Sequence, residues 1–466
     1  MISNHKRLGL LFVAALTVVV AAGCNETLRQ FIVPVPKPTG DPGALSHAVI
    51  LSTNPAPSSN GSTLHIDVSG DTIAGVVPTG PNPVFLGKTP GRVFVINGDD
   101  TITSYIALSP TVPPFSTITL PTGPPNPATT PVFGGTTSVG NFYVTNRGSD
   151  NTSVVSLAAL AQTESIPLPA TSHQPVAIAG NAANSKMYIV NNGTNDVTVV
   201  STTDNTIIKP SIPVGLHPIW GVMATNGVQV FIVNQGDPGA TPPIPGSVSV
   251  IDTTLDTVIP CTPGPSCDAT THAITVGTTA TSSPNFAFYD SERQRLFVSN
   301  SGENTVSVIK ADGIDLGAVP QVLPGLLKNI TVSGAPLSVA ALANGSRAYA
   351  ALANCAVPMG TTILPVNHTT LVDKLAAGDC AGSQVSVIDL NALLETKTIQ
   401  VGKGAVSIDA AADGSRVYVV GAQAGNVSII RTSTDSVNTT FAAPQRDLSC
   451  TSSCPLQTPF MVRVFP

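Results

Sequence analysis

The sequence is poor in charge and in aromatic side chains. Only 10% of its 466 residues are charged, 5% are aromatic, and tryptophan occurs once, as Trp220. Its lysines and arginines form no cluster, and the formal net charge is −6 at pH 7. Because binding to a phosphate backbone requires a basic surface, this composition excludes a broad nucleic-acid interface, and we expect no nucleic-acid partner.

The short motifs of several catalytic and cofactor sites are also missing. The chain contains no His-Glu-x-x-His, no Gly-x-Ser-x-Gly and no Cys-x-x-Cys-His, the signatures of zinc proteases, α/β-hydrolases and haem attachment. Gly402-Lys403-Gly404 lacks the third glycine of a dinucleotide fingerprint and is interpreted as a turn. We therefore predict no catalytic residue, no cofactor and no metal ligand.

Long apolar runs are absent except at the N-terminus. After the basic start His5-Lys6-Arg7, an uncharged apolar run covers residues 8–22, which is too short to span a bilayer comfortably and is typical of a signal-peptide core. The run ends in Ala21-Ala22-Gly23-Cys24, and small residues before a cysteine resemble the lipobox of bacterial lipoproteins. The alternative is an ordinary secretory signal with an incidental cysteine.

The lipobox resemblance implies an address in the cell. It implies cleavage before Cys24, acylation of Cys24, and a membrane as the first partner, with several acyl chains holding the protein firmly. Asn25 stands where an inner-membrane retention signal carries Asp. We expect the cell envelope of a bacterium, on the periplasmic or outer-membrane and surface side.

Three segments follow from the composition. Residues 1–23 form the predicted lipoprotein signal peptide, and residues 24–44 form a tether rich in proline and glycine, which favours extended chain over helix. Residues 45–466 form the folded domain.

Cysteine is scarce, with seven in the chain. Without Cys24 an even number remains, in a chain exported to an oxidising compartment, which favours disulfides. Six cysteines allow 15 pairings, and proximity in the sequence suggests Cys261 with Cys267, Cys355 with Cys380, and Cys450 with Cys454. Free thiols and a metal site are the alternatives, although no Cys-x-x-Cys spacing supports a metal.

One phrase recurs along most of the chain, an aromatic residue followed by small β-branched residues and asparagine. Its copies are 93–97, 142–146, 187–191, 230–234 and 296–300, with degenerate copies at 348–352 and 417–421. A segment rich in small residues precedes the phrase, an alternating Val-Ser-Val-Ile segment follows it, and a segment ending in Val-Gly closes the unit. Alternation at period two with turn residues between predicts four short strands per unit.

These linked phrases resemble the YVTN-type, YncE-like β-propeller repeat. The resemblance implies an all-β fold in which four-stranded blades stack around an axis and bury both of their apolar faces. Ala and Gly in the first strand agree with crowding near that axis. The repeat is specific to a fold and not to an activity.

Counting second strands gives the number of blades. An incomplete unit lies at each end of the folded domain. The N-terminal one has a second, third and fourth strand at residues 47–54, 63–68 and 72–77 but no first strand before them, and the C-terminal one has only a first strand, at residues 459–464. Joined, they make one blade from both termini and remove the free edges of an open ring. We predict a single propeller of eight four-stranded blades, with seven as the alternative.

The repeat also indicates where function is expected. Long insertions at 122–131, 235–246 and 355–380 gather on one face, the expected surface for an envelope protein or ligand. His173, His217 and Trp220 fall at the starts of first strands, near the mouth of the channel, and no blade pairs a His with a carboxylate there. We expect a monomeric, lipid-anchored binding or scaffold module without chemistry of its own. The alternative is a propeller hydrolase or lyase of the lactonase or streptogramin-lyase kind.

Overall fold

The computed structural model describes most of the domain in twelve segments. They are residues 46–53, 60–89, 91–107, 116–121, 130–138, 140–169, 173–181, 184–311, 323–354, 380, 382–444 and 457–465. The described part is entirely β-structure, and no helix in it could cross a membrane.

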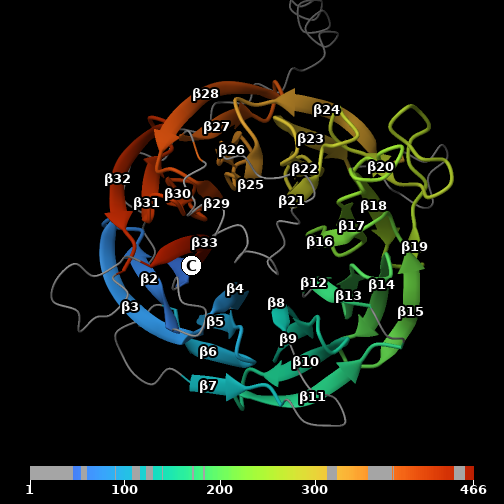
Figure 1. Ribbon diagram of the computed structural model, residues 1–466, viewed down its shortest axis with the longest axis horizontal. Helices are drawn as coiled ribbons and strands as arrows, with labels where there is room; N and C mark the ends of the chain where they lie inside the picture. The colour runs from blue at the N-terminus through green and yellow to red at the C-terminus, as the bar shows by residue number, and fades with distance from the viewer. Residues whose placement is uncertain are drawn as a thin grey trace, which may run out of the picture. The chain divides into compact units, whose positions relative to one another are not determined.

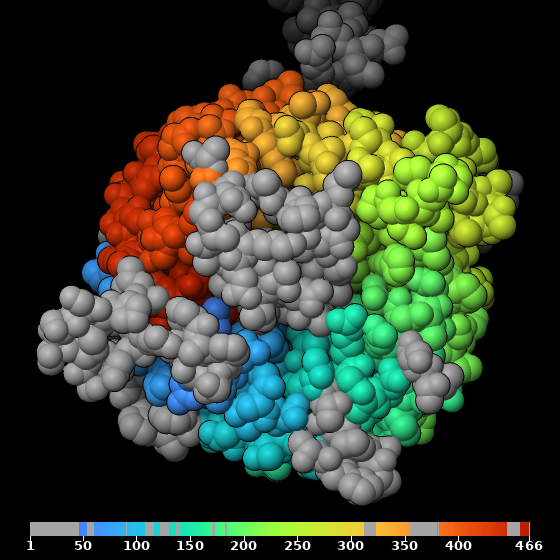
Figure 2. Space-filling view, in the orientation of Figure 1, coloured from blue at the N-terminus to red at the C-terminus, as the bar shows by residue number. Residues whose placement is uncertain are grey.

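Eight antiparallel sheets form the blades of a propeller (Figure 1), and successive blades follow one another around the ring (Figure 2). Blade 1 contains β4 (Pro83–Thr89), β5 (Arg92–Asn97), β6 (Thr101–Ile106) and β7 (Ser116–Thr119), and blade 2 contains β8 (Pro131–Ser138), β9 (Asn141–Asn146), β10 (Asn151–Ser156) and β11 (Ala161–Pro167). Blade 3 contains β12 (Pro175–Ala179), β13 (Lys186–Asn191), β14 (Asp196–Ser201) and β15 (Ile207–Pro213). Blade 4 contains β16 (Pro218–Met223), β17 (Gln229–Asn234), β18 (Ser247–Asp252), β19 (Thr257–Val258) and β20 (Ile274–Thr275).

Blades 5 to 8 complete the ring. Blade 5 contains β21 (Pro284–Asp290), β22 (Arg295–Asn300), β23 (Thr305–Lys310) and β24 (Gly325–Thr331), and blade 6 contains β25 (Pro336–Ala341), β26 (Arg347–Leu352), β27 (Ser383–Asp389) and β28 (Leu394–Val401). Blade 7 contains β29 (Ala405–Ala410), β30 (Arg416–Gly421), β31 (Asn426–Arg431) and β32 (Ser436–Ala442). Blade 8 contains β33 (Thr458–Phe465), β1 (His47–Thr53), β2 (Asn60–Asp67) and β3 (Thr72–Pro81).

Blade 8 is built from both ends of the chain, which confirms the predicted closure and the count of eight. The C-terminal strand β33 lies innermost and pairs antiparallel with β1, from His47 opposite Phe465 to Thr53 opposite Thr458. Arg416 of blade 7 adds an ion pair with Asp71 of blade 8, at 3.0 Å from its Nε. The ring is therefore closed by the main-chain hydrogen bonds between β33 and β1 and by an ion pair between blades 7 and 8.

The asparagine of the repeated phrase ties the second strand to the third. Asn146 donates from Nδ2 to Asn151 Oδ1 at 2.6 Å and to Ser153 Oγ at 2.8 Å. The same pair of hydrogen bonds recurs at Asn97, Asn191, Asn234 and Asn300. Because these side chains are fully buried, each pair satisfies an amide nitrogen that would otherwise be costly to bury, whereas the Oδ1 of each asparagine has no partner within the described structure.

The glycine that ends the fourth strand fits against the asparagine of the next blade. The amide of Gly215 donates to Ser249 Oγ at 3.2 Å, and a Cβ added at Gly215 would lie 2.6 Å from Asn234 Nδ2 and 2.7 Å from Ser247 Oγ. Gly80 lies against Asn97 in the same way. The recurring Gly and Asn therefore form one contact between neighbouring blades.

Replacement of Gly215 by alanine should disturb this contact. We expect Gly215→Ala to lower the free energy of unfolding by about 1–3 kcal/mol, because the added methyl group overpacks a buried polar site. Gly264→Ala is the matched control, since a Cβ there meets no atom within 4 Å, and it should stay within about 0.5 kcal/mol of the wild type. Chemical denaturation of both variants measures the difference; equal stabilities would contradict the contact.

Connections lie on two opposite faces. The upper face carries the connections from second to third strands and from blade to blade, and the lower face carries the hairpins between first and second and between third and fourth strands. The insertion 235–246 lies on the upper face, as expected. The insertions at 122–131 and 355–380 lie almost wholly outside the described residues.

Candidate functional site

Every innermost strand has a β-bulge near its start, and the residue after the bulge occupies an equivalent place in each blade. Figure 1 shows these strands around the centre of the ring. We call the eight equivalent residues the channel ring: Phe85, Phe133, Ala177, Trp220, Phe286, Ser338, Ser407 and Met461.

Aromatic side chains of the channel ring contact one another. The ring centroids of Phe85 and Phe133 are 4.4 Å apart, those of Phe133 and Trp220 5.5 Å, and those of Trp220 and Phe286 5.0 Å. Phe133 belongs to blade 2 and Trp220 to blade 4, so their contact passes in front of blade 3, where the equivalent residue is the small Ala177. Phe85, Phe133 and Trp220 are at most 9% exposed, so these side chains pack against one another near the axis of the ring. The innermost strands therefore carry larger side chains than the alanine and glycine that the sequence led us to expect there.

Trp220 holds the only indole of the chain. Its side chain is 9% exposed, and within the described structure its Nε1 is buried without a hydrogen-bond partner. Buried indole N–H groups usually find a partner. Phe286, the next aromatic of the channel ring, is partly exposed. The cluster is thus an apolar group of side chains that contains one buried N–H donor without a partner in the described structure.

The opposite side of the channel is polar. Ser407 Oγ accepts a hydrogen bond from Val462 N at 3.2 Å, and Asp409 Oδ2 accepts one from Val464 N at 2.8 Å. Both donors are amides of the innermost strand β33. These side chains of blade 7 therefore satisfy two amides on the free main-chain edge of blade 8, which Phe and Trp side chains cannot do because they carry no acceptor.

His173 and His217 lie at the upper face and are held by their own turns. His173 is 3% exposed, with Nδ1 at 3.0 Å from Thr194 Oγ1 and 3.6 Å from Asp196 Oδ1. His217 is exposed, adopts a positive φ of 49°, and places Nδ1 at 2.9 Å from Gly236 O. The expectation that no first strand has a His beside a carboxylate was wrong, because the turn after β13 brings Asp196 back to His173.

Sequence reasoning found Trp220 but missed Phe85, Phe133 and Phe286. A usable signal was present, since each of these four aromatic residues follows the proline that opens the innermost strand by two positions. The bulge after the proline turns that position toward the channel, and a bulge cannot be read from alternation alone.

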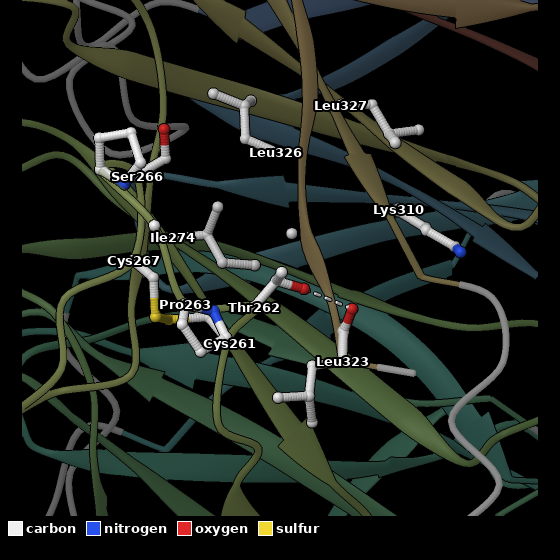
Figure 3. Close-up of a pocket in the computed structure, with 13 residues that line it drawn as sticks. Cys261, Thr262, Pro263, Ser266, Cys267, Ile274, Lys310, Leu323, Leu326 and Leu327 are labelled. Atoms are coloured by element: carbon white, nitrogen blue, oxygen red, sulfur yellow. Dashed lines mark hydrogen bonds between the residues drawn. A yellow bond between two sulfur atoms is a disulfide. The ribbon is translucent and has the colours of Figure 1, made fainter. Parts of the chain in front are cut away.

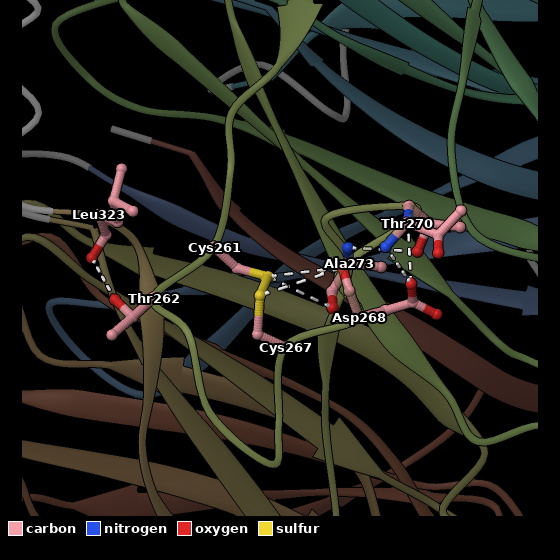
Figure 4. Close-up of a disulfide and its surroundings, with 8 residues drawn as sticks. Cys261, Thr262, Cys267, Asp268, Thr270, Ala273 and Leu323 are labelled. Atoms are coloured by element: carbon pink, nitrogen blue, oxygen red, sulfur yellow. Dashed lines mark hydrogen bonds between the residues drawn. A yellow bond between two sulfur atoms is a disulfide. The ribbon is translucent and has the colours of Figure 1, made fainter.

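A second candidate lies on the outer wall, where a loop interrupts the outer strand of blade 4. Its two halves, β19 and β20, both pair with β18, and the loop between them is closed by a disulfide from Cys261 to Cys267 (Figure 4). Thr262 fastens the loop to blade 5, donating from N to Pro324 O at 2.8 Å and from Oγ1 to Leu323 O at 2.9 Å. Hydrogen bonds from the Thr271 and Thr270 amides hold the pKa of Asp268 below its usual range.

The loop and β24 enclose a groove of about 620 Å³ (Figure 3). Its apolar lining includes Leu323, Leu326, Leu327 and Ile274. This volume falls within the range of about 300–1,000 Å³ usual for ligand pockets, so the groove could accept a small apolar group.

The other cysteines are only partly described. Cys380 is disulfide-bonded, whereas Cys24, Cys355, Cys450 and Cys454 lie outside the described residues. Among the residues that the structure describes, no group of three or more His, Cys, Asp and Glu side chains could hold a metal ion.

The fold and the channel define the chain as an eight-bladed β-propeller. No protein-family model and no curated protein matches the sequence. Among solved structures it is similar to the dihydro-haem d1 dehydrogenase NirN in complex with DHE, with a TM-score of 0.57 and 11% identity over 90% of this chain and 74% of that one. It is also similar to apo AztD from Citrobacter koseri, with a TM-score of 0.55 and 9% identity over 90% and 98% of the two chains. At such identities the likeness shows the fold alone.

Proposed function

We propose that the protein is a lipid-anchored, extracytoplasmic propeller of the YVTN-repeat type that acts as a binding module without chemistry of its own. The anchor is Cys24, and the tether is the segment 24–44. The bound molecule is an aromatic or other flat apolar compound that carries a hydrogen-bond acceptor. The observation that supports this proposal best is the aromatic cluster of the channel ring with its unpartnered Trp220 indole.

Asymmetry is the reason for assigning a binding role to the cluster. All eight positions of the channel ring have the same main-chain geometry. In blades 6 and 7 this position is occupied by the small residues Ser338 and Ser407. Large aromatic residues are therefore not needed to build a blade. Rigid aromatic surfaces bind ligands with little loss of conformational entropy, and a related architecture, that of NirN, has been solved with a bound ligand.

The channel ring can be tested with the dye anilinonaphthalene sulfonate, an aromatic anion. We expect energy transfer from Trp220, the only Trp donor, to dye bound in the channel. Phe133→Ala and Phe286→Ala keep the donor and remove one wall, so the dye should bind them about tenfold more weakly. Leu255→Ala, at a side chain 63% exposed on the outer rim, should bind like the wild type. Equal titration curves for all four proteins would contradict a site in the channel.

A hydrolase or lyase of the lactonase or streptogramin-lyase kind is the second candidate. Its specific support is the His173–Asp196 pair, with Nδ1 at 3.6 Å from Oδ1 near the upper face. Metal analysis of the purified protein discriminates between the two functions, because these enzymes often use a divalent ion; a stoichiometric metal would favour the enzyme.

A further inference from the structure

Seven of the eight large hydrophobic side chains that are exposed in the described structure lie at one end of the propeller. The described residues include eight large hydrophobic side chains that are exposed. Six lie at the lower ends of the outer strands and hairpins: Ile73, Ile106, Ile208, Leu255, Leu327 and Leu394. Val228 lies in a lower hairpin of blade 4, and Ile244 lies in an upper-face connection. A single exposed aliphatic residue is ordinary on a protein surface, but this unequal distribution requires a reason.

Four of these six residues also lie at a similar height along the propeller axis. Ile73, Ile208, Leu327 and Leu394 all belong to the first three residues of a fourth strand, in blades 8, 3, 5 and 6. Equivalent places in the blades of a ring lie near one plane perpendicular to its axis. A flat partner can therefore touch several of them at once, whereas a compact partner would reach only one or two.

Three acidic side chains near this rim are paired with basic side chains of neighbouring blades. Asp256 pairs with Lys186 at 2.7 Å and also accepts a hydrogen bond from Tyr188 Oη at 2.6 Å. Asp435 pairs with Arg347 and Asp71 with Arg416, each between neighbouring blades. These pairs lower the repulsion between the rim and an anionic lipid surface.

The N-terminal chain enters the propeller at the same end. β1 is a second strand, so its first residue His47 lies at the lower face, and Val68 N donates to Ser46 O at 3.0 Å beside it. Residues 24–45 can span at most about 80 Å when fully extended. The lipid anchor is therefore attached to the end of the molecule that carries the exposed aliphatic side chains.

We propose that the lower face rests on a lipid bilayer, with the aliphatic rim in contact with the headgroup region, and that the upper face with its insertions points away from the membrane. This orientation rests on the proposed acylation of Cys24. Aliphatic side chains partition into the interface of a bilayer, and their contacts add to the hold of the acyl chains. The arrangement leaves the channel mouth and the insertions accessible to envelope molecules.

Quenching by brominated lipid tests the orientation in the full-length, lipid-modified protein. Two variants are made in a Trp220→Phe background and reconstituted into phosphatidylcholine vesicles with and without brominated chains. Leu255→Trp places the fluorophore on the lower rim, at a side chain that is 63% exposed, and Ile244→Trp places it on the upper face, at a side chain that is 41% exposed. We expect brominated lipid to reduce the Leu255→Trp emission by about half and to leave the Ile244→Trp emission unchanged.

Two measurements distinguish a failure of the proposed lipid anchor from a failure of the proposed orientation. Vesicle flotation is measured first, with Cys24→Ser as the unanchored comparison. If the wild type does not float, the lipid anchor fails. If it floats but the Leu255→Trp emission is quenched no more than that of Ile244→Trp, the anchor holds and the proposed orientation is overturned.

Discussion

A chain that ends before Thr458 should lose cooperative folding. The deletion removes β33 and four buried large side chains, Phe460, Val462, Val464 and Phe465, at most 7% exposed. At about 1.5–3 kcal/mol each, their loss amounts to about 6–12 kcal/mol, comparable with the whole stability of a typical domain. It also leaves β1 with an unpaired edge. Calorimetry of the truncated protein should show no single cooperative transition.

A circular permutant provides the control for this truncation. Phe465 pairs directly with His47, as Thr89 pairs with Arg92 in blade 1, where two residues join the strands. A chain that starts at Gln457, joins Phe465 to His47 through a two-residue turn and ends at Pro444 should regain a cooperative transition. If the permutant stays unfolded, or if the truncated chain folds as well as the wild type, closure by β33 is not what stabilises the ring.

The second large effect is a loss of stability in acid that depends on His65. This residue of β2 is fully buried against blade 1, with Nε2 at 2.8 Å from Tyr105 Oη and its ring 5.8 Å from that of His47. Burial lowers the pKa of His65 to about 3. The unfolded chain, with a pKa of about 6.5, binds the proton first as the pH falls, so the folded state loses stability below pH 6.5 and the loss is complete below the folded pKa.

Linkage gives the size of this effect. Between pH 8 and pH 5, His65 alone should cost about 2 kcal/mol of unfolding free energy. His65→Gln, which cannot titrate, should flatten the curve by that amount, while its stability at pH 8 falls because the packing against Tyr105 changes. Leu255→Ala, at an exposed side chain that carries no titratable group, should keep the wild-type slope. Denaturation curves at both pH values measure the slopes; an unchanged slope in His65→Gln would rule out this origin.

Local pattern was enough to predict the blades. The recurring Asn, the alternating third strand and the terminal Val-Gly each serve a contact within a blade or with its direct neighbour, so most copies of the repeat contain them, although Leu352 and Gly421 replace the Asn in two copies. The closure was also predictable, because an incomplete unit at each end can be completed only by the other.

The candidate site was predicted much less well. Trp220 was recognised as a channel-mouth residue, but its partners Phe133 and Phe286 come from other blades and touch it only across the channel. The pairing of His173 with Asp196 depends on the course of one turn. The sequence spacing within a repeat carries no information about which side chains meet across the axis of a ring.

The amino-acid sequence by itself determined the repeating unit and the all-β class, because these depend on hydrogen bonds and packing that each unit repeats. It favoured eight blades and closure by both termini over seven blades, and the pairing of β33 with β1 decided between the two. Only the tertiary structure decided which residues face the channel, which face of the propeller receives the N-terminal chain, and where the exposed aliphatic side chains gather. Those features arise when eight similar units are arranged around one axis, which places residues from distant parts of the chain side by side.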